Sequence, residues 1–293
     1  MAATQTVQVP HLEARVGYAI SNNKLDTSKP TWVLINPMCT SVEFYRAQLD
    51  SKTLTAAVNL VAIEPLGHGV TTCATEHFTY WDTALIALQA LEALGVKKAY
   101  ALGTSQGGWI IMRMALLAPE KILGLIPLGT SMDAETSESR EKGCWDPVPF
   151  LQPFLEKWGS PTPNFVVGDD WIQAVIGLGF GSAGTPQALE FWTETLRRVY
   201  SGDEGRRKLR MAAICLADRD GLQLRLGDIK CPVNWLHGSA DAIFTYVVAQ
   251  EHFTLFTGSC DAQSNVLEGG AHFLVATHAK EVEDAILAMT AKA

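Results

Sequence analysis

The sequence predicts an α/β protein in which helices flank a mostly parallel, twisted sheet. Two observations carry this prediction. Short apolar runs, partly β-branched and bounded by turn residues, have the character of buried parallel strands. Helical patterns separate these runs, and an alternation of strand and helix produces a parallel sheet with right-handed crossovers. The runs in the first part of the chain are Thr31–Ile35, Val58–Ile63, Lys98–Leu102 and Ile122–Ile126.

Two helices are expected between the strands of this first part. Trp81–Leu94 repeats leucine at one-turn spacing and is followed by Gly95, a residue suited to end a helix. Ser105–Leu117 is the second helical pattern, and Pro119 lies just beyond its end.

A segment rich in Gly, Pro and Trp then interrupts the alternation. We expect residues 131–210 to form a helical cap, with helices near Trp171–Ile176 and Pro186–Tyr200, and residues 1–130 and 211–293 to form the core domain. The α/β pattern resumes with two strands and two helices. They are expected at Cys231–Leu236, Tyr246–Phe256, Asn265–Leu267 and Val275–Met289.

Composition narrows the class of protein. The 293 residues are 47% hydrophobic and 18% charged, enough to bury a large core. A net charge of −8 and the lack of a Lys/Arg run argue against a nucleic acid or an anionic membrane as partner. No long apolar run or signal-like start is seen, and the six cysteines show no metal-site spacing. We therefore expect a cytoplasmic protein with reduced thiols and no metal.

Ser105 is the candidate nucleophile. It lies in Gly103-Thr-Ser-Gln-Gly107, between a predicted strand and a predicted helix. A tight turn at such a junction strains the serine backbone, exposes its hydroxyl above the sheet edge and requires small neighbours. The Gln106 N–H and the start of the helix would then lie where they stabilise an oxyanion.

A serine hydroxyl needs a base, and the base needs a carboxylate to orient it. His272 follows the last predicted strand, and Asp241 follows the strand that ends at Leu236. The order Ser, Asp, His, each after a strand, is that of one large class of triad enzymes. Asp133, after an earlier strand, remains the alternative acid.

With these residues the sequence resembles the α/β-hydrolase family over nearly its whole length. Gly67-His68-Gly69 and the run from Leu117 to Leu125 also resemble segments of that family. The resemblance implies a catalytic triad and a cap inserted after the sixth strand. The loop that usually begins His-Gly instead reads Asn36-Pro-Met-Cys39. Pro37 has no N–H, so we expect Met38 to supply the second oxyanion donor, with Cys39 as the alternative.

The predicted activity is cleavage of a carboxylic ester, lactone or thioester through an acyl-enzyme on Ser105. The aromatic-rich cap suggests a hydrophobic or aromatic small molecule as substrate, and the chain loosely resembles hydrolases of secondary metabolism. No cofactor is required. The residues expected to contact substrate are Trp109, Trp145, Trp171 and Trp192.

Other interpretations remain open. An acyltransferase or a C–C bond hydrolase would use the same triad, and a ligand receptor can share the fold. Gly179-Phe-Gly-Ser-Ala-Gly184 matches a dinucleotide-binding pattern but follows a predicted helix, so we interpret it as a segment of the cap. His68, His237 and His278 are interpreted as structural.

Overall fold

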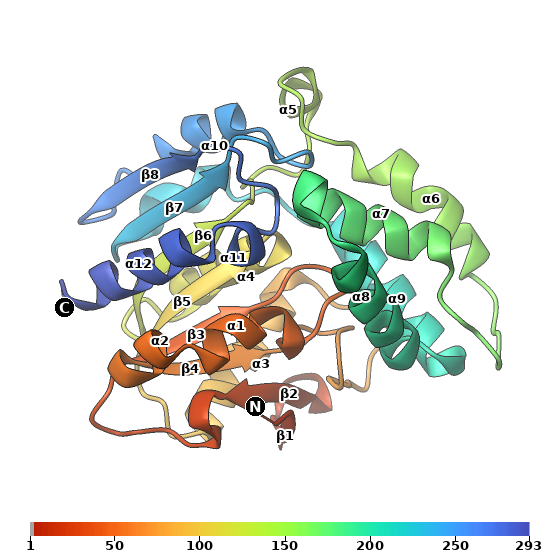
Figure 1. Cartoon of the computed structure of the whole chain (residues 1–293), viewed down its shortest axis with the longest axis horizontal. Helices are drawn as coiled ribbons and strands as arrows, with labels where there is room; N and C mark the ends of the chain where they lie inside the picture. The colour runs from red at the N-terminus through yellow and green to blue at the C-terminus, as the bar shows by residue number, and fades with distance from the viewer. Residues whose placement is uncertain (1–2, 293) are drawn as a thin grey trace.

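An eight-stranded sheet organises residues 3–292, which the computed structural model describes (Figure 1). The strand order is β1-β2-β4-β3-β5-β6-β7-β8, and every pair from β4 to β8 is parallel. The predicted fold class is therefore confirmed. The strands are β1 (Gln5–Gln8), β2 (Arg15–Ile20), β3 (Thr31–Ile35), β4 (Asn59–Ile63), β5 (Ala99–Thr104), β6 (Ile122–Leu128), β7 (Val233–Gly238) and β8 (Ala262–Leu267).

The antiparallel edge formed by β1 and β2 was not recognised in the sequence. β2 pairs antiparallel with β4, and β1 pairs antiparallel with β2. β1 has four residues, three of them polar, and it is mostly exposed. A short, polar edge strand has no apolar face to bury, so no alternation of hydrophobic residues marks it.

Helices cover both faces of the sheet (Figure 1). On one face α1 (Arg46–Asp50), α2 (Lys52–Ala57) and α12 (Ala279–Thr290) contact one another. On the other face α3 (Tyr80–Ala93) packs against α4 (Gln106–Leu117). The remaining elements of the core region are η1 (His11–Glu13), η2 (Ser21–Asn23), η3 (Val42–Tyr45), α10 (Tyr246–Phe253) and α11 (Leu274–Thr277).

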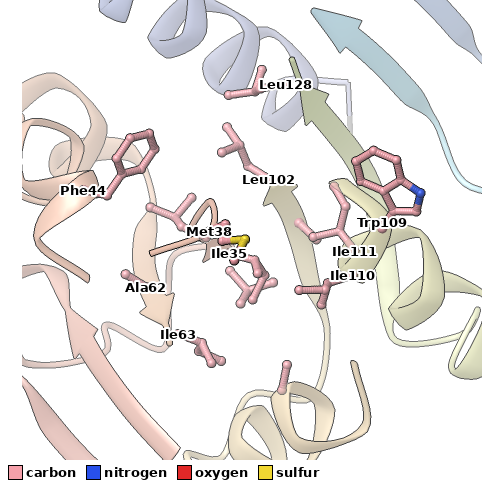
Figure 2. Close-up of a cluster of buried hydrophobic side chains, with 14 of the residues drawn as sticks. Ile35, Met38, Phe44, Ala62, Ile63, Leu102, Trp109, Ile110, Ile111 and Leu128 are labelled. Atoms are coloured by element: carbon pink, nitrogen blue, oxygen red, sulfur yellow. The ribbon is translucent and has the colours of Figure 1, made fainter. Parts of the chain in front are cut away.

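The central strands are buried on both faces. All residues of β3, β4 and β5 are buried, as helices on both sides require. Figure 2 shows Ile35 of β3, Leu102 of β5 and Leu128 of the neighbouring β6 beside Ile110 and Ile111 of α4. This apolar packing fixes the position at which β5 ends and α4 begins.

Five α-helices lie between β6 and β7, gathered beyond one side of the sheet in Figure 1. We call them the insertion helices. The expected division at residue 210 falls inside α9, which continues to Ala217. The insertion helices are α5 (Ser137–Glu141), α6 (Pro147–Lys157), α7 (Asp169–Phe180), α8 (Pro186–Val199) and α9 (Gly202–Ala217), with η4 (Gly181–Ala183) after α7 and η5 (Gln223–Asp228) after α9.

A pair of leucine substitutions tests the contribution of the central strands to stability. Leu102 of β5 is 1% exposed, whereas Leu224 is 98% exposed. Leu102→Ala should lower the free energy of unfolding by about 2–5 kcal/mol, because it removes buried methyl groups and leaves a cavity. Leu224→Ala should change it by less than about 0.5 kcal/mol. Urea unfolding measures both, and similar losses would contradict the burial assigned to β5.

Candidate active site

The backbone of Ser105 is strained, as the Gly-x-Ser-x-Gly pattern predicts. Its φ of 55° and ψ of −121° lie in a region that non-glycine residues rarely adopt. The Ser105 N–H donates to the Leu128 carbonyl oxygen of β6 at 2.9 Å, and the Gly108 N–H donates to the Ser105 carbonyl at 2.8 Å. These bonds hold the serine between the end of β5 and the start of α4.

The flanking glycines are required by close packing. A Cβ on Gly103 would collide with the carbonyl of Gly107, and a Cβ on Gly107 would collide with the carbonyl of Ile35. The turn therefore brings the first turn of α4 directly against the ends of β3 and β5. No residue larger than glycine fits at either position.

His272 and Asp241 are brought together, although they come from separate loops. His272 Nδ1 lies 2.9 Å from Asp241 Oδ2, and both side chains are almost completely buried. The other carboxylate oxygen, Oδ1, accepts hydrogen bonds from the Ile243 and Phe244 N–H groups at 2.8 and 3.0 Å. Both oxygens of the carboxylate are thus held by hydrogen bonds. The carboxylate in turn orients the imidazole through Nδ1, and Nε2 takes no part in this hydrogen bond.

The surroundings favour an ionised Asp241. Burial by itself would raise the pKa of this carboxyl, but His272, His237 and the Phe244 N–H together outweigh it, and the pKa is lowered. His237 Nε2 donates to the Phe244 carbonyl at 2.8 Å and lies 3.4 Å from Asp241 Oδ2. Because burial lowers the pKa of His237, this second imidazole is neutral at neutral pH.

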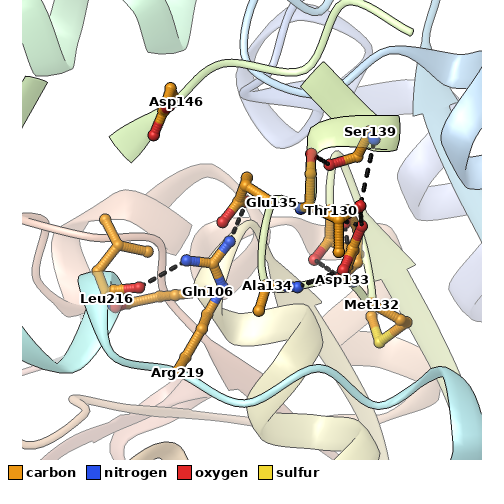
Figure 3. Close-up of polar contacts among 12 residues, drawn as sticks. Gln106, Thr130, Met132, Asp133, Ala134, Glu135, Ser139, Asp146, Leu216 and Arg219 are labelled. Atoms are coloured by element: carbon orange, nitrogen blue, oxygen red, sulfur yellow. Dashed lines mark hydrogen bonds and ion pairs between the residues drawn. The ribbon is translucent and has the colours of Figure 1, made fainter. Parts of the chain in front are cut away.

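Asp133, the alternative acid, has other partners. Its carboxylate accepts from the Thr136 hydroxyl at 2.7 Å and from the Ala134 N–H at 2.7 Å. Figure 3 shows Asp133 and Ala134 beside a buried ion pair between Glu135 and Arg219. Among the described residues, the carboxylate hydrogen-bonded to His272 belongs to Asp241, so the geometry favours Asp241 over Asp133.

Ser105 and His272 line the same cavity. The empty space in it, open solvent included, is about 520 Å³. Ser105 and His272 are the only hydroxyl-bearing or ionisable residues that line it in residues 3–292. The hydrogen bonds found there do not include one between the Ser105 hydroxyl and His272, a bond that often tightens only when substrate binds. The other lining residues are apolar or aromatic: Pro37, Met38, Trp145, Phe150, Trp171, Val175, Leu178, Leu216, Ile243, Phe244 and Phe273.

The four tryptophans expected to contact substrate divide into two pairs. Trp145 and Trp171 line the cavity. Trp109 is completely buried in α4 and lies under the guanidinium of Arg219. Trp192 is 4% exposed and packs against Phe44. Neither Trp109 nor Trp192 is among the residues that line the cavity, so the substrate contact expected of these two is not retained.

One of the two expected oxyanion donors lines this cavity, and the other is next in the chain to a residue that lines it. Met38 lines it, and Gln106 directly follows Ser105 as the first residue of α4. Within residues 3–292, neither the Met38 N–H nor the Gln106 N–H has a hydrogen-bond acceptor. For Gln106 this follows from its place in the first turn, where N–H groups have no partner within the helix.

The buried polar contacts next to these donors were not recognised in the sequence. Gln106 and His68 are buried and hydrogen-bonded to each other, and Gln106 also donates to the Asn36 carbonyl. Buried polar side chains have no periodic signature, so only the fold reveals their partners. Asn36, at the end of β3, was noted only as a departure from the usual His-Gly.

Three further features bear on other classes of function. Gly179–Gly184, the glycine pattern in the predicted cap, lies at the end of α7 and in η4, so no strand precedes it. In the described part of the chain, no group of three or more His, Cys, Asp or Glu side chains could hold a metal ion. None of the helices in residues 3–292 has the length and apolar character needed to cross a membrane.

Comparison with known proteins agrees with this architecture. Residues 34–161 match the family model described as alpha/beta hydrolase fold. A hydrolase from Pseudomonas aeruginosa PA01 is 21% identical with a TM-score of 0.76, covering 98% of this chain and 97% of that one. A thermophilic esterase from Thermogutta terrifontis is 17% identical with a TM-score of 0.77, covering 99% of both chains.

An enol-lactonase from Burkholderia xenovorans LB400 is also similar. It is 17% identical with a TM-score of 0.77, covering 97% of this chain and 99% of that one. At such identities the similarity shows the fold. The chain therefore has the α/β-hydrolase fold, and the resemblance found in the sequence is confirmed.

The buried His68 predicts a pH dependence of stability. Burial lowers the pKa of His68 from 6.5 to about 4, against a hydrogen bond to Leu66 that raises it. The unfolded chain takes up this proton at higher pH than the folded protein, so stability is complete above about pH 6.5 and is lost as the pH falls toward 4. Between pH 7 and 5 this histidine should lower the free energy of unfolding by about 2 kcal/mol.

Replacing His68 isolates its share of this dependence. In His68→Gln, the difference in unfolding free energy between pH 7 and pH 5 should shrink by about 2 kcal/mol, as measured by urea titration at each pH. An unchanged difference would mean that His68 is not neutral in the folded protein.

Proposed function

We propose that this protein is a serine hydrolase that cleaves a carboxylic ester, lactone or thioester through an acyl-enzyme on Ser105. The observation that carries the proposal is the His272–Asp241 hydrogen bond of 2.9 Å, with His272 lining the same cavity as the strained Ser105. Strained serine, oriented imidazole and buried carboxylate are the parts that activate a hydroxyl nucleophile.

In the proposed mechanism His272 accepts the hydroxyl proton while Ser105 Oγ attacks the carbonyl carbon of the substrate. Asp241 holds the proton on Nδ1, so Nε2 has a free lone pair, and the carboxylate stabilises the imidazolium that forms. His272 then gives the proton to the leaving alcohol or thiol. Water attacks the acyl-enzyme by the same route in reverse, and Ser105 is regenerated.

The Gln106 and Met38 N–H groups are the proposed oxyanion donors. Both belong to segments that meet at Ser105, and neither has an acceptor within residues 3–292. In hydrolases of known mechanism, one such donor contributes about 3 kcal/mol to stabilising the transition state.

The cavity supports an uncharged, apolar acyl or aromatic group as the part of the substrate that is bound. None of its lining residues is acidic, Lys or Arg, and four of the aromatic ones are Trp145, Phe150, Trp171 and Phe244. A charged group would lose its hydration there without gaining a partner. The names of the similar esterase and enol-lactonase refer to bonds of the same class. We also propose that the insertion helices act as the cap, since α6 and α7 supply Phe150 and Trp171.

Labelling by a fluorophosphonate tests whether Ser105 is activated. The wild-type protein should gain one phosphonyl group by intact mass, because Ser105 Oγ displaces fluoride from phosphorus. Ser105→Ala, which removes only the hydroxyl oxygen, should gain none. The absence of an adduct on folded wild-type protein would contradict the proposed mechanism.

Replacement of Asp241 by asparagine tests the orientation of His272. The asparagine oxygen can still accept from Ile243 and Phe244, but its NH2 then faces Nδ1 and favours the tautomer protonated on Nε2. The kcat for a simple ester should fall about 10⁴-fold. As control, Asp228→Asn changes an exposed carboxylate paired with Arg225 and should keep the wild-type kcat. Equal kcat values for the two variants would exclude Asp241 from the triad.

A further inference from the structure

A buried polar cluster lies next to the two proposed oxyanion donors. The side-chain amide of Gln106 is at its centre, 1% exposed. Gln106 Nε2 lies 3.0 Å from His68 Nε2 and donates to the Asn36 carbonyl at 3.3 Å. Gln106 Oε1 accepts from the Tyr80 hydroxyl at 3.3 Å. The cluster therefore joins the loop after β3, the turn after β4, and α3 to the first residue of α4.

The hydrogen bonds allow one arrangement of protons in this cluster. His68 Nδ1 lies 2.9 Å from the Leu66 carbonyl oxygen, so the proton of the neutral imidazole is on Nδ1. His68 Nε2 then carries a lone pair and accepts one N–H of the Gln106 amide. The second N–H donates to the Asn36 carbonyl, and Oε1 accepts from Tyr80. Both N–H groups and the oxygen of the amide therefore have partners, so the orientation of the amide is fixed.

The side chain of Asn36 continues this hydrogen-bonded cluster into the loop that carries Met38. Its Nδ2 donates to the Pro37 carbonyl at 3.2 Å and to the Thr40 carbonyl at 3.1 Å. The Thr40 hydroxyl donates to the same Pro37 carbonyl at 2.8 Å. The Thr40 N–H also donates to this oxygen at 3.4 Å, so three donors hold the oxygen of the Pro37–Met38 peptide bond.

The planarity of that peptide bond links this anchoring to catalysis. In a trans peptide the C=O and the N–H point in opposite directions, and no cis peptide bond is present in residues 3–292. Holding the Pro37 oxygen against Asn36 and Thr40 therefore turns the Met38 N–H away from them. Pro37 and Met38 of this loop line the same cavity as Ser105, and an oxyanion would form in that cavity.

We propose that the Gln106 side chain, Asn36 and His68 are positioning residues that fix the Met38 N–H relative to the Gln106 N–H. This inference rests on the proposed function. Gln106 would provide one oxyanion donor from its backbone, while its side chain anchors the loop that provides the other. The backbone and the side chain of Gln106 together then set the distance between the two donors, whether or not substrate is bound.

Two substitutions that preserve approximate size test this role. Gln106→Met leaves the backbone N–H of residue 106 in place but removes the amide that holds Asn36 and His68. Asn36→Leu removes one of the side chains that hold the Pro37 carbonyl, and with it the contacts to Thr40. Removing one oxyanion donor outright costs about 10²–10³ in kcat. We therefore expect these variants to lose about 10- to 100-fold in kcat for a simple ester, with KM changed by less than about threefold.

Asn59→Leu is the matched control. Asn59 is 4% exposed, and its Nδ2 donates to the Asp26 and Lys29 carbonyls at 2.8 and 3.1 Å. It therefore also holds a loop through buried backbone contacts, but at the opposite end of the parallel strands, where β4 begins. The Asn59→Leu variant should have a lower melting temperature, as Asn36→Leu should, but its kcat should stay within about threefold of wild type.

A trifluoromethyl ketone gives a readout that loss of stability alone does not change. Its adduct with the serine is an oxyanion, so its affinity should fall in proportion to kcat/KM in Gln106→Met and Asn36→Leu. In Asn59→Leu its affinity should not change. If all three variants keep wild-type kcat and ketone affinity, or lose them equally, the inference is overturned.

The outcome separates this inference from the proposed function. A wild-type protein that neither reacts with fluorophosphonate nor hydrolyses esters contradicts the proposed function itself. An active wild type with unaffected variants contradicts the positioning role alone. If either variant does not fold, His68→Gln and His68→Leu replace it. The glutamine oxygen can accept from Gln106, so His68→Gln should retain about tenfold more kcat than His68→Leu, and equal losses would overturn the inference.

Discussion

The strained backbone of Ser105 is the constraint on which the site depends. A φ of 55° at a serine persists only where the surroundings leave no alternative. Here β6 accepts the serine N–H through Leu128, and the first turn of α4 lies so close to β3 and β5 that Gly103 and Gly107 cannot carry a side chain. The strain is thus held by three neighbouring strands, and the same close approach places the Gln106 N–H beside the serine.

Much of this arrangement could be predicted because it follows local rules. The parallel strands are continuous apolar runs, and the glycines around Ser105 lie at a strand-to-helix junction, so both leave a pattern in the sequence. Asp241 and His272 could be predicted because each follows a strand of one parallel sheet, and the carboxyl ends of such strands share an edge. Their hydrogen bond agrees with that expectation.

The features that escaped prediction depend on contacts across the fold. Trp109 and Trp145 look alike in sequence, yet one is completely buried against Arg219 and the other lines the cavity. Whether a tryptophan packs into the core or lines the cavity is decided by what lies opposite it in the fold. Gln106 contacts His68 and Asn36, which are 38 and 70 residues away in the chain. A buried polar residue takes whatever partner the fold supplies.

The insertion helices are tied to the segments that carry the site. The Phe273 N–H, next to His272, donates to the Gly179 carbonyl of α7 at 2.8 Å, and the Tyr200 hydroxyl donates to the Gly67 carbonyl at 3.2 Å. A movement of α7 away from the sheet would break the first bond and leave a peptide group beside the imidazole without its partner. The position of α7 and the position of His272 are therefore coupled, so a helix that lines the cavity also constrains the residue that acts in it.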